Sequence, residues 1–542
     1  MSGAPHPAEG RRTFVDRVSR WIAAFAAIAV ALAGVIWGTH VAGGPDSYCY
    51  LSQAELFASG HVMHVEPLAA ETTWGKGAAA FVPVGHVPAF SRPDASVPMC
   101  SPGYPIVMAT VRPLGGRRAM FGVVPVLGAL TVWLTFLLAR RVGGEASGAA
   151  AAMLMAASPA FLYQVVQPMS DVPATALWTA ALVAATHPRL AESTWRSALA
   201  GLCTGAAIFM RPNLVPMAGV VALSIFCEWP VPWRKALRSW IVFAAGVAPF
   251  VAVVALLQNA MYGSPFRSGY GSLSLLFRLE HVWPNLQRYP VWFLQTETPI
   301  VLLALIAPWL MRDATARRRA VWLLGFAAAV FACYIPYEVF DAWWFLRFVL
   351  PAYPPLLVLT ASALMALLAR RRVGTAWRSA GLAGVALLSV LLVRIAIERH
   401  AFGLWEFERR FRLAGEYVAA RLPRNALIVT AQESGSVRFY SGRSTLTWRE
   451  LPPDGLDRML AFVRAHGYHP YFLIETGEQA EFVQQFEGKS PLGNLGWPPS
   501  VDINHMLRIY DPDDYTKYRG GVPVRTDRVW TTKKRNWLGF KF

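Results

Sequence analysis

Long apolar stretches separated by short polar connections dominate this chain of 542 residues. The first stretch runs from Trp21 to Trp37 and is about long enough to cross a hydrocarbon core of roughly 30 Å. Charged residues make up 15% of the chain, against about a quarter of a soluble domain. The pattern predicts a polytopic α-helical membrane protein with about eleven spans. The later stretches lie at approximately 118–139, 148–166, 172–187, 196–210, 213–228, 239–258, 292–311, 320–337, 345–369 and 379–397.

Basic residues between the apolar stretches indicate how the chain is oriented. They gather in every second connection, and the alternate connections carry few of them. Because connections rich in Lys and Arg stay in the cytoplasm, we predict a cytoplasmic N-terminus and an extracytoplasmic C-terminus in a multi-pass protein of the bacterial cytoplasmic (inner) membrane. These signals also account for the net charge of +18, so no nucleic-acid partner is expected. The clusters are Arg140/Arg141, Arg189/Arg196, Arg234/Lys235/Arg238, Arg312/Arg317/Arg318/Arg319 and Arg370/Arg371/Arg372/Arg378.

Three parts of the chain follow from this pattern. Residues 1–20 form a basic cytoplasmic N-terminus, and residues 21–398 form the transmembrane domain, with a large first outer loop at 38–103. From 399 to 542 the pattern changes to strands alternating with helices, which predicts an extracytoplasmic α/β domain. Its predicted strands are 426–430, 471–474 and 506–510, and its predicted helices are 454–466 and 478–486. The domain has no phosphate-binding glycine motif, so we assign it no nucleotide.

In this topology, the polar segments that are not orientation signals converge on the outer side of the membrane. The spans contain almost no ionisable residues, with Arg394 the main exception. An ion-coupled transporter usually needs ionisable residues inside its spans, so their scarcity favours chemistry at the outer membrane face. The converging segments are Asp46, 167–171, 210–212, 259–291 and 337–341.

Asp46 lies just after the first span, which places its carboxylate at the edge of the membrane rather than inside it. Gly44 and Pro45 break the preceding helix, and Asp46 with Ser47 can cap a new one. The new helix would lie along the membrane surface, within reach of a water-soluble acceptor and a lipid headgroup. A helix-capping role alone would also explain Asp46. The predicted helix carries one face made of Tyr50, Ala54, Phe57 and Ala58.

Four motifs in order along the chain resemble the GT-C-type glycosyltransferases that use polyprenyl-phosphate sugars. This superfamily includes the protein O-mannosyltransferases and the lipid A aminoarabinose transferases. The chain departs from many relatives in having Pro-Asp46 where they have two adjacent acids, which leaves a single carboxylate at this position. The motifs are Asp46-Ser47-Tyr48-Cys49-Tyr50, Cys100-Ser101-Pro102-Gly103-Tyr104-Pro105, Met169-Ser170-Asp171-Val172-Pro173 and Arg347-Phe348-Val349-Leu350-Pro351-Ala352-Tyr353-Pro354.

The resemblance implies a membrane glycosyltransferase that moves a sugar from a polyprenyl-phosphate donor to an acceptor hydroxyl. Asp46 is then the candidate general base for the acceptor, and Tyr48 of the same motif is a candidate substrate-binding residue. The phosphate leaving group needs charge stabilisation by positioned cations, for which Arg347 has the best motif support. The acceptor could be a lipid, a glycan or a protein, and membrane lipid is a further partner. The candidate cations on the outer side are Lys76, Arg211, Arg267 and Arg347.

Asp171 is a second candidate carboxylate, although Ser170-Asp171-Val172-Pro173 also reads as a helix start. It could orient substrate or bind a divalent metal, as outer-loop carboxylates do in some relatives. His61, His64 and Glu66 are close in sequence, but their spacing matches no recognised metal-ligand pattern. No cofactor is therefore assigned, and a divalent metal stays open.

Cys49 and Cys100 both fall in the predicted outer compartment, which is oxidising. A bridge between them would hold together the two ends of the loop around Asp46. Both the bridged and the free states are compatible with the sequence.

Two other classes of function remain as alternatives. A transporter or flippase of a lipid-linked substrate would require ionisable residues or broken helices within the spans. A non-catalytic membrane scaffold, binding a partner through its α/β domain, would tolerate replacement of Asp46.

Overall fold

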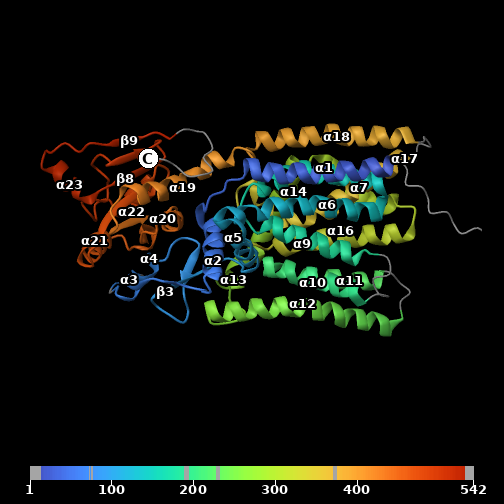
Figure 1. Ribbon diagram of the computed structural model, residues 1–542, viewed down its shortest axis with the longest axis horizontal. Helices are drawn as coiled ribbons and strands as arrows, with labels where there is room; N and C mark the ends of the chain where they lie inside the picture. The colour runs from blue at the N-terminus through green and yellow to red at the C-terminus, as the bar shows by residue number, and fades with distance from the viewer. Residues whose placement is uncertain are drawn as a thin grey trace, which may run out of the picture.

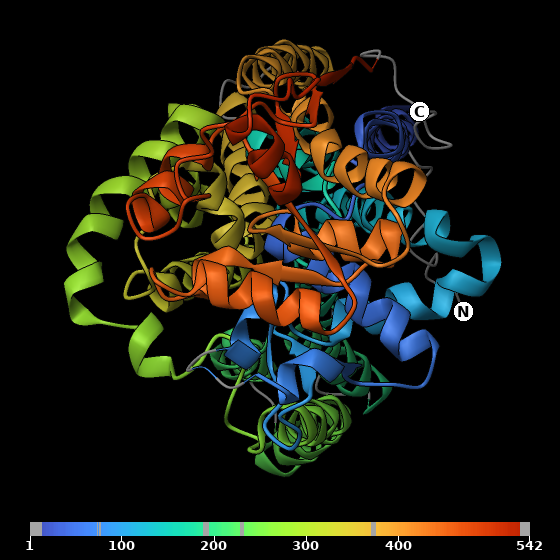
Figure 2. The same ribbon diagram turned by 90° about the vertical axis from the view of Figure 1, so that its left-hand side faces the viewer.

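A bundle of long helices forms most of the structure, and an α/β unit lies at one end of it (Figure 1). The computed structural model describes residues 14–72, 74, 77–187, 194–227, 232–369 and 375–531. Viewed from that end, the α/β unit lies in front of the ends of the long helices (Figure 2). Residues 1–13 of the basic N-terminus, Arg189 and Arg370–Arg372 lie outside the described residues.

Each apolar stretch of the sequence folds as one helix or as two or three consecutive helices. Their buried sides form one large apolar core of small and aliphatic side chains, as expected where helices pack closely in a membrane. The helices are α1 (Phe14–Trp37), α5 (Gly103–Phe121), α6 (Val123–Gly143), α7 (Glu145–Ala157), α8 (Pro159–Val165), α9 (Asp171–Ala185), α10 (Thr194–Met210), η2 (Pro212–Leu214), α11 (Pro216–Cys227), α12 (Trp233–Tyr262), α13 (Leu273–Leu276), η3 (Leu279–His281), α14 (Val282–Glu297), η4 (Pro299–Leu302), α15 (Leu303–Leu310), α16 (Ala314–Tyr334), η5 (Trp343–Ala352), α17 (Tyr353–Ala369) and α18 (Thr375–Glu398).

Two of the predicted spans are bent rather than continuous helices. Within the described residues, five helices are long and apolar enough to cross a membrane, or up to seven if each bent pair is one span. The pair α7 and α8 bends by 61°, and the segment Leu279–Glu297 meets Pro299–Leu310 at 113°. Pro159 and Pro299 each follow the break directly, because proline lacks the N–H that a continuing helix needs. The total of about eleven spans stays a prediction.

The loop between α1 and α5 forms a small folded unit of its own. Strands β1, β3 and β2 pair antiparallel in that order as one sheet within the described part of the loop. The short helices α3 and α4 pack beside the C-terminal unit, in the same apolar cluster as Trp448. The elements are α2 (Gly44–Ala58), β1 (His64–Val65), α3 (Pro67–Ala70), α4 (Gly77–Ala80), β2 (His86–Pro88) and β3 (Ala95–Pro98).

Helix α2 differs from its prediction in where it begins and in how deeply it is buried. It begins at Gly44, with Gly43 at the N-cap position and Pro45 in the first turn, where the missing proline N–H costs nothing. Asp46 is therefore inside the first turn, and the prediction that it caps the helix is wrong. From Ser47 to Ala54 every residue is buried, because α5, β3 and α20 (Ser434–Ser441) all pack on α2. The helix predicted to lie along the membrane surface is thus enclosed from Ser47 to Ala54, while Pro45 and Ala58 at its two ends are exposed. It runs across the ends of the long helices (Figure 1).

The C-terminal α/β unit follows its sequence pattern closely. Within the described residues its sheet has six strands in the order β5-β4-β6-β8-β7-β9. Strand β4 pairs parallel to both β5 and β6, whereas β6 pairs antiparallel to β8. The elements are α19 (Leu404–Arg421), β4 (Ala426–Thr430), α20, β5 (Thr445–Thr447), η6 (Trp448–Glu450), α21 (Leu456–Ala465), β6 (His469–Glu475), α22 (Gln479–Phe486), β7 (Val501–Ile503), β8 (Leu507–Tyr510), α23 (Pro512–Arg519) and β9 (Asp527–Val529).

A buried polar cluster fastens the first loop to the α/β unit. Arg438 of α20 forms an ion pair with Glu66, and Glu66 also accepts a hydrogen bond from Ser96 at 2.9 Å. Close by, the ring of Tyr48 stacks on that of His86 with centroids 5.1 Å apart. Burial beside the Arg438 guanidinium lowers the pKa of His64 to about 4, so this histidine is neutral at physiological pH. The Arg438–Glu66 ion pair and the stacked rings of Tyr48 and His86 therefore hold α20 in contact with α2.

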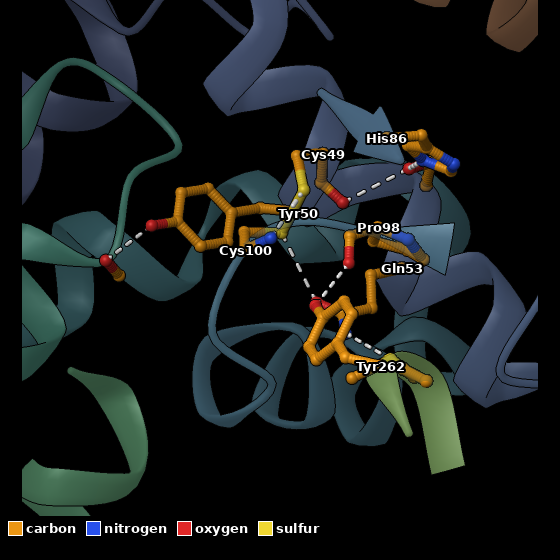
Figure 3. Close-up of a disulfide and its surroundings, with 10 residues drawn as sticks. Cys49, Tyr50, Gln53, His86, Pro98, Cys100 and Tyr262 are labelled. Carbon is orange, nitrogen blue, oxygen red and sulfur yellow. Dashed lines mark hydrogen bonds between the residues drawn. A yellow bond between two sulfur atoms is a disulfide. The ribbon is translucent and has the colours of Figure 1, made fainter. Parts of the chain in front are cut away.

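Cys49 and Cys100 form a disulfide at the centre of this packing (Figure 3). The bridge joins α2 to the segment between β3 and α5, across 51 residues of chain. Beside it, the Tyr262 hydroxyl at the end of α12 donates to the carbonyl oxygen of Pro98 at 2.6 Å. The disulfide and this hydrogen bond hold α2 and the loop in one position relative to the bundle.

We expect Cys100→Ser to lower the stability of the protein by about 2–4 kcal/mol, because removing a bridge lets the unfolded loop explore more conformations. Thermal unfolding in detergent measures the loss, and Cys203→Ser, at a free cysteine, is the matched control. Intact-mass analysis of the native protein after alkylation without reductant provides the direct check. Alkylation of both Cys49 and Cys100 in that experiment would contradict the bridge.

Candidate active site

One large cavity lies where the helix bundle, the first loop and the α/β unit meet. Its volume is about 1510 Å³, above the roughly 300–1,000 Å³ of ordinary small-molecule sites. The sequence segments predicted to converge on the outer side all contribute to its wall. These segments supply Asp46, Gln167, Met169, Ser170, Asp171, Arg211, Pro212, Tyr262, Phe266, Tyr270, Phe277, Tyr337, Glu338 and Phe340.

Asp46 and Arg347 form an ion pair in the cavity wall. The guanidinium Nη2 of Arg347 donates to Asp46 Oδ2 at 2.7 Å. The side chain of Arg347 is 17% exposed and that of Asp46 is 35% exposed, so both reach the cavity from mostly enclosed positions. The same guanidinium lies 5.1 Å from the ring centre of Phe348, a cation–π contact that holds it in place. The pair joins the start of α2 to the irregular helix η5. Asp46 and Arg347 are 301 residues apart in the sequence.

Asp171 and Arg211 form a second and deeper pair. Arg211 Nη1 lies 2.5 Å from Asp171 Oδ1, and the side chains are only 12% and 3% exposed. Burial acts against the charged form of Arg211, but the Asp171 carboxylate outweighs it and raises the pKa of this arginine further. The Arg211 guanidinium also lies 5.4 Å from the ring centre of Phe348. Two fixed positive charges therefore flank one aromatic ring.

Tyr50, on the same helix as Asp46, contacts the residue next to Asp171 and so connects the two ion pairs. Its hydroxyl lies 2.7 Å from Ser170 Oγ, directly beside Asp171 in sequence. Burial raises the pKa of Tyr50 well above its ordinary value, so the phenol stays protonated and serves as a hydrogen-bonding group. Met169 completes the link, with its sulfur near both Ser47 Oγ and Arg347 Nη1.

The fold of this chain matches that of solved membrane enzymes. ArnT from Cupriavidus metallidurans, bound to undecaprenyl phosphate, superposes with a TM-score of 0.55 at 15% identity, covering 86% of this chain and 95% of that one. The archaeal oligosaccharyltransferase AglB from Archaeoglobus fulgidus, in complex with an inhibitory peptide and a dolichol-phosphate, gives 0.55 at 11% identity, with 92% and 75% covered. This chain has the GT-C fold.

Sequence comparison points to the same class over part of the chain. Residues 102–257 match the family described as dolichyl-phosphate-mannose-protein mannosyltransferase. No curated protein matches the chain in sequence. The family match and the GT-C fold together indicate a multi-pass membrane glycosyltransferase. The side of the membrane on which each terminus lies stays a prediction.

The structure brings together most of the residues that the sequence singled out. Asp46, Asp171, Arg211 and Arg347 all line the cavity. The sequence did not predict their pairing: Arg211 is held by Asp171, and Arg347 is held by Asp46. In this arrangement Asp171 orients Arg211, and the catalytic and binding roles themselves stay proposals.

Three other predicted residues do not join this group. Tyr48 is buried between α2 and α20, against His86, and does not line the cavity. Arg267 is exposed, and its neighbours Phe266 and Ser268 line the cavity in its place. Lys76 lies outside the described residues.

Asp46 and Asp171 do not resemble a metal centre, because each of these two cavity carboxylates is paired with an arginine. Among the described residues, one group of three acidic or histidine side chains is close enough to hold an ion. It consists of His469, Asp511 and Asp513 in the α/β unit, none of which lines the cavity. Glu66 pairs with Arg438 and is not part of that group. We therefore derive no step through a metal.

Two carboxylates outside the predicted set of site residues are largely enclosed in the structure. Glu408 of α19 lines the cavity; it follows the last span by only ten residues, which could have placed it near the membrane surface. Glu297 is buried in the predicted span 292–311, one of the spans in which almost no ionisable residues were expected. It accepts a hydrogen bond from Ser158 at 2.8 Å, and it lies at the bend between α14 and η4.

Replacing Asp171 with Asn should destabilise the protein by about 3–5 kcal/mol, because it leaves the Arg211 charge buried without a counter-charge. Thermal unfolding in detergent measures the change. Glu280→Gln is the matched control, since its partner Arg278 is 46% exposed and Glu280 itself is 65% exposed; an exposed pair of this kind contributes at most about 1 kcal/mol. Equal effects of the two substitutions would show that the Asp171–Arg211 pair does not support the site.

Proposed function

We propose that this protein moves a sugar from a polyprenyl-phosphate donor to an acceptor hydroxyl at the outer face of the cytoplasmic membrane. The observation that carries the proposal is the Asp46–Arg347 pair, a carboxylate and a guanidinium that both reach one large cavity. The undecaprenyl phosphate named with ArnT and the dolichol-phosphate named with AglB support a lipid-linked donor for the fold.

The donor phosphate would bind at Arg347, with Arg211 behind it. Guanidinium groups make strong, directional hydrogen bonds to phosphate, and both arginines are held against Phe348. Apolar side chains of the segment between α12 and α14 line the cavity as well, among them Phe266, Leu273 and Leu276. They offer an apolar path along which the polyprenyl chain can leave the cavity toward the lipid.

Asp46 would act as the general base. When the phosphate takes hydrogen bonds from Arg347, the Asp46 carboxylate loses its present partner and becomes free to accept a proton. The acceptor oxygen then attacks the anomeric carbon and forms the new glycosidic bond while its proton passes to Asp46. The bond from the anomeric carbon to the phosphate oxygen breaks, and the polyprenyl phosphate leaves with the electron pair, stabilised by the arginines.

A transporter is the runner-up, because the structure contains bent helices and the buried Glu297. Such features often mark substrate paths in transporters. Glu297, however, does not line the cavity, and its Oε1 accepts a hydrogen bond from Ser158 at the start of α8. A role in joining two broken helices accounts for this residue and favours the enzyme.

We expect Asp46→Asn to reduce sugar transfer by about 10²–10⁴-fold, because the amide keeps the shape of the side chain but cannot accept the acceptor proton. The assay follows consumption of radiolabelled polyprenyl-phosphate sugars by membranes that contain each variant. Asp94→Asn, which changes a half-buried acid of the same loop that pairs with Arg92, is the matched control.

Equal consumption of one donor by the native protein and Asp46→Asn would remove Asp46 as the base. If the native protein consumes none of the donors offered, the proposed function fails and the transporter becomes the leading candidate.

A further inference from the structure

The part of the cavity nearest the α/β unit differs in chemistry from the part beside the arginines. Its wall comes from α19, from α8 with the residues just after it, and from the turn between β4 and α20. Aromatic rings of Phe407 and Phe411 alternate there with polar side chains. The polar side chains are Gln164, Gln167, Glu408, Arg410 and Gln432.

Glu408 is the central acid of this wall and has no strong partner. Its side chain is 21% exposed, and its ionic neighbour Arg410 lies 3.8 Å away. Arg410 instead donates Nε to Glu475 at 2.8 Å and Nη1 to the carbonyl of Phe407 at 2.9 Å. Glu408 accepts no hydrogen bond from a described residue, so its carboxylate is available to a ligand that brings donors.

The position of Glu408 is close to the start of α2. A Cβ atom on Gly43 would overlap Glu408 Oε2, and atoms of Phe411 would also meet it. Only glycine at position 43 leaves room for α19 to approach. Because Asp46 lies three residues further on, the two carboxylates face the cavity from neighbouring elements.

Gln164 offers a second hydrogen-bond acceptor without a partner. It is 2% exposed and lines the cavity, and its Oε1 accepts no hydrogen bond from the described residues. The amide nitrogen of Gln167 donates a hydrogen bond to the carbonyl oxygen of Tyr163 at 2.8 Å. The amide oxygen of Gln167 is therefore the group that can accept a hydrogen bond from a ligand. A buried acceptor without a donor is costly, so this wall is built for a ligand rich in donors.

We propose that the wall formed by α19 and α8 binds a carbohydrate acceptor, with Glu408 and Gln164 accepting hydrogen bonds from its hydroxyl groups. Hydroxyl groups supply donors without adding charge, and the rings of Phe407 and Phe411 suit the apolar faces of sugar rings. An anionic acceptor would meet the Glu408 carboxylate, and the nearby Arg410 is already occupied. The inference rests on the proposed function, because it places the acceptor in the same cavity as the donor.

Binding of neutral oligosaccharides to the full-length protein in detergent tests this proposal by native mass spectrometry. The probes are trisaccharides of mannose, glucose, arabinose and N-acetylglucosamine, with a serine- and threonine-rich peptide beside them. We expect at least one trisaccharide to bind, and Glu408→Gln to weaken that binding by about tenfold or more, as for loss of a hydrogen bond to a charged group. Glu406→Gln, an exposed acid on the same helix, should leave it unchanged.

The pH dependence of binding separates a direct role of Glu408 from a structural one. Burial, opposed by Arg410 and reinforced by Glu475, raises the pKa of Glu408 to about 7. The Tyr163 phenol and the backbone at Gly43 are the other groups that face it. Trisaccharide affinity should therefore rise as pH increases through 7 and Glu408 ionises, and this rise should vanish in Glu408→Gln.

Undecaprenyl phosphate, added to the same samples, keeps the two proposals distinguishable. Glu408→Gln should bind undecaprenyl phosphate as the native protein does. If the native protein itself does not bind undecaprenyl phosphate, that result contradicts the donor site alone. The acceptor proposal is overturned if no trisaccharide binds, if Glu408→Gln binds the trisaccharide as tightly as the native protein, or if the peptide binds in place of the trisaccharides and is lost in Glu408→Gln.

Discussion

The pairing of two arginines with two aspartates around Phe348 is the interaction on which the cavity depends. Unpaired, each guanidinium would be a costly charge in a mostly enclosed wall. Asp46 and Asp171 neutralise Arg347 and Arg211 and fix their direction. The resting cavity is therefore close to neutral at its centre, and it can exchange one carboxylate for an incoming phosphate without rebuilding the wall.

The burial of α2 follows from this requirement. Asp46 can reach Arg347 only if the start of α2 stays fixed against the bundle, and the disulfide, Tyr262 and the Glu66–Arg438 pair all act to fix it. The α/β unit thus does more than extend from the membrane domain. It closes over α2, holds the first loop and contributes α19 to the cavity wall.

The sequence predicts the elements of this structure better than their contacts. Apolar length and periodicity locate the helices, and short apolar runs locate β4, β6 and β8, because these signals are local. The charge alternation also predicts that Asp46, Asp171, Arg211 and Arg347 share one side of the membrane. It cannot predict which arginine pairs with which aspartate. Asp46 and Arg347 are 301 residues apart, and only the packing of the helices decides which carboxylate each arginine contacts. The bend at Pro299 and the role of Glu408 were missed for the same reason, since each depends on a neighbour from another part of the chain.

A cryo-electron microscopy structure of the protein with bound undecaprenyl phosphate would show whether Arg347 exchanges Asp46 for the donor phosphate. We expect the phosphate to lie within hydrogen-bonding distance of Arg347, Asp46 to have separated from this arginine, and the polyprenyl chain to run along the wall of Phe266 and Leu273. A phosphate bound elsewhere, with the Asp46–Arg347 pair still closed, would contradict this exchange.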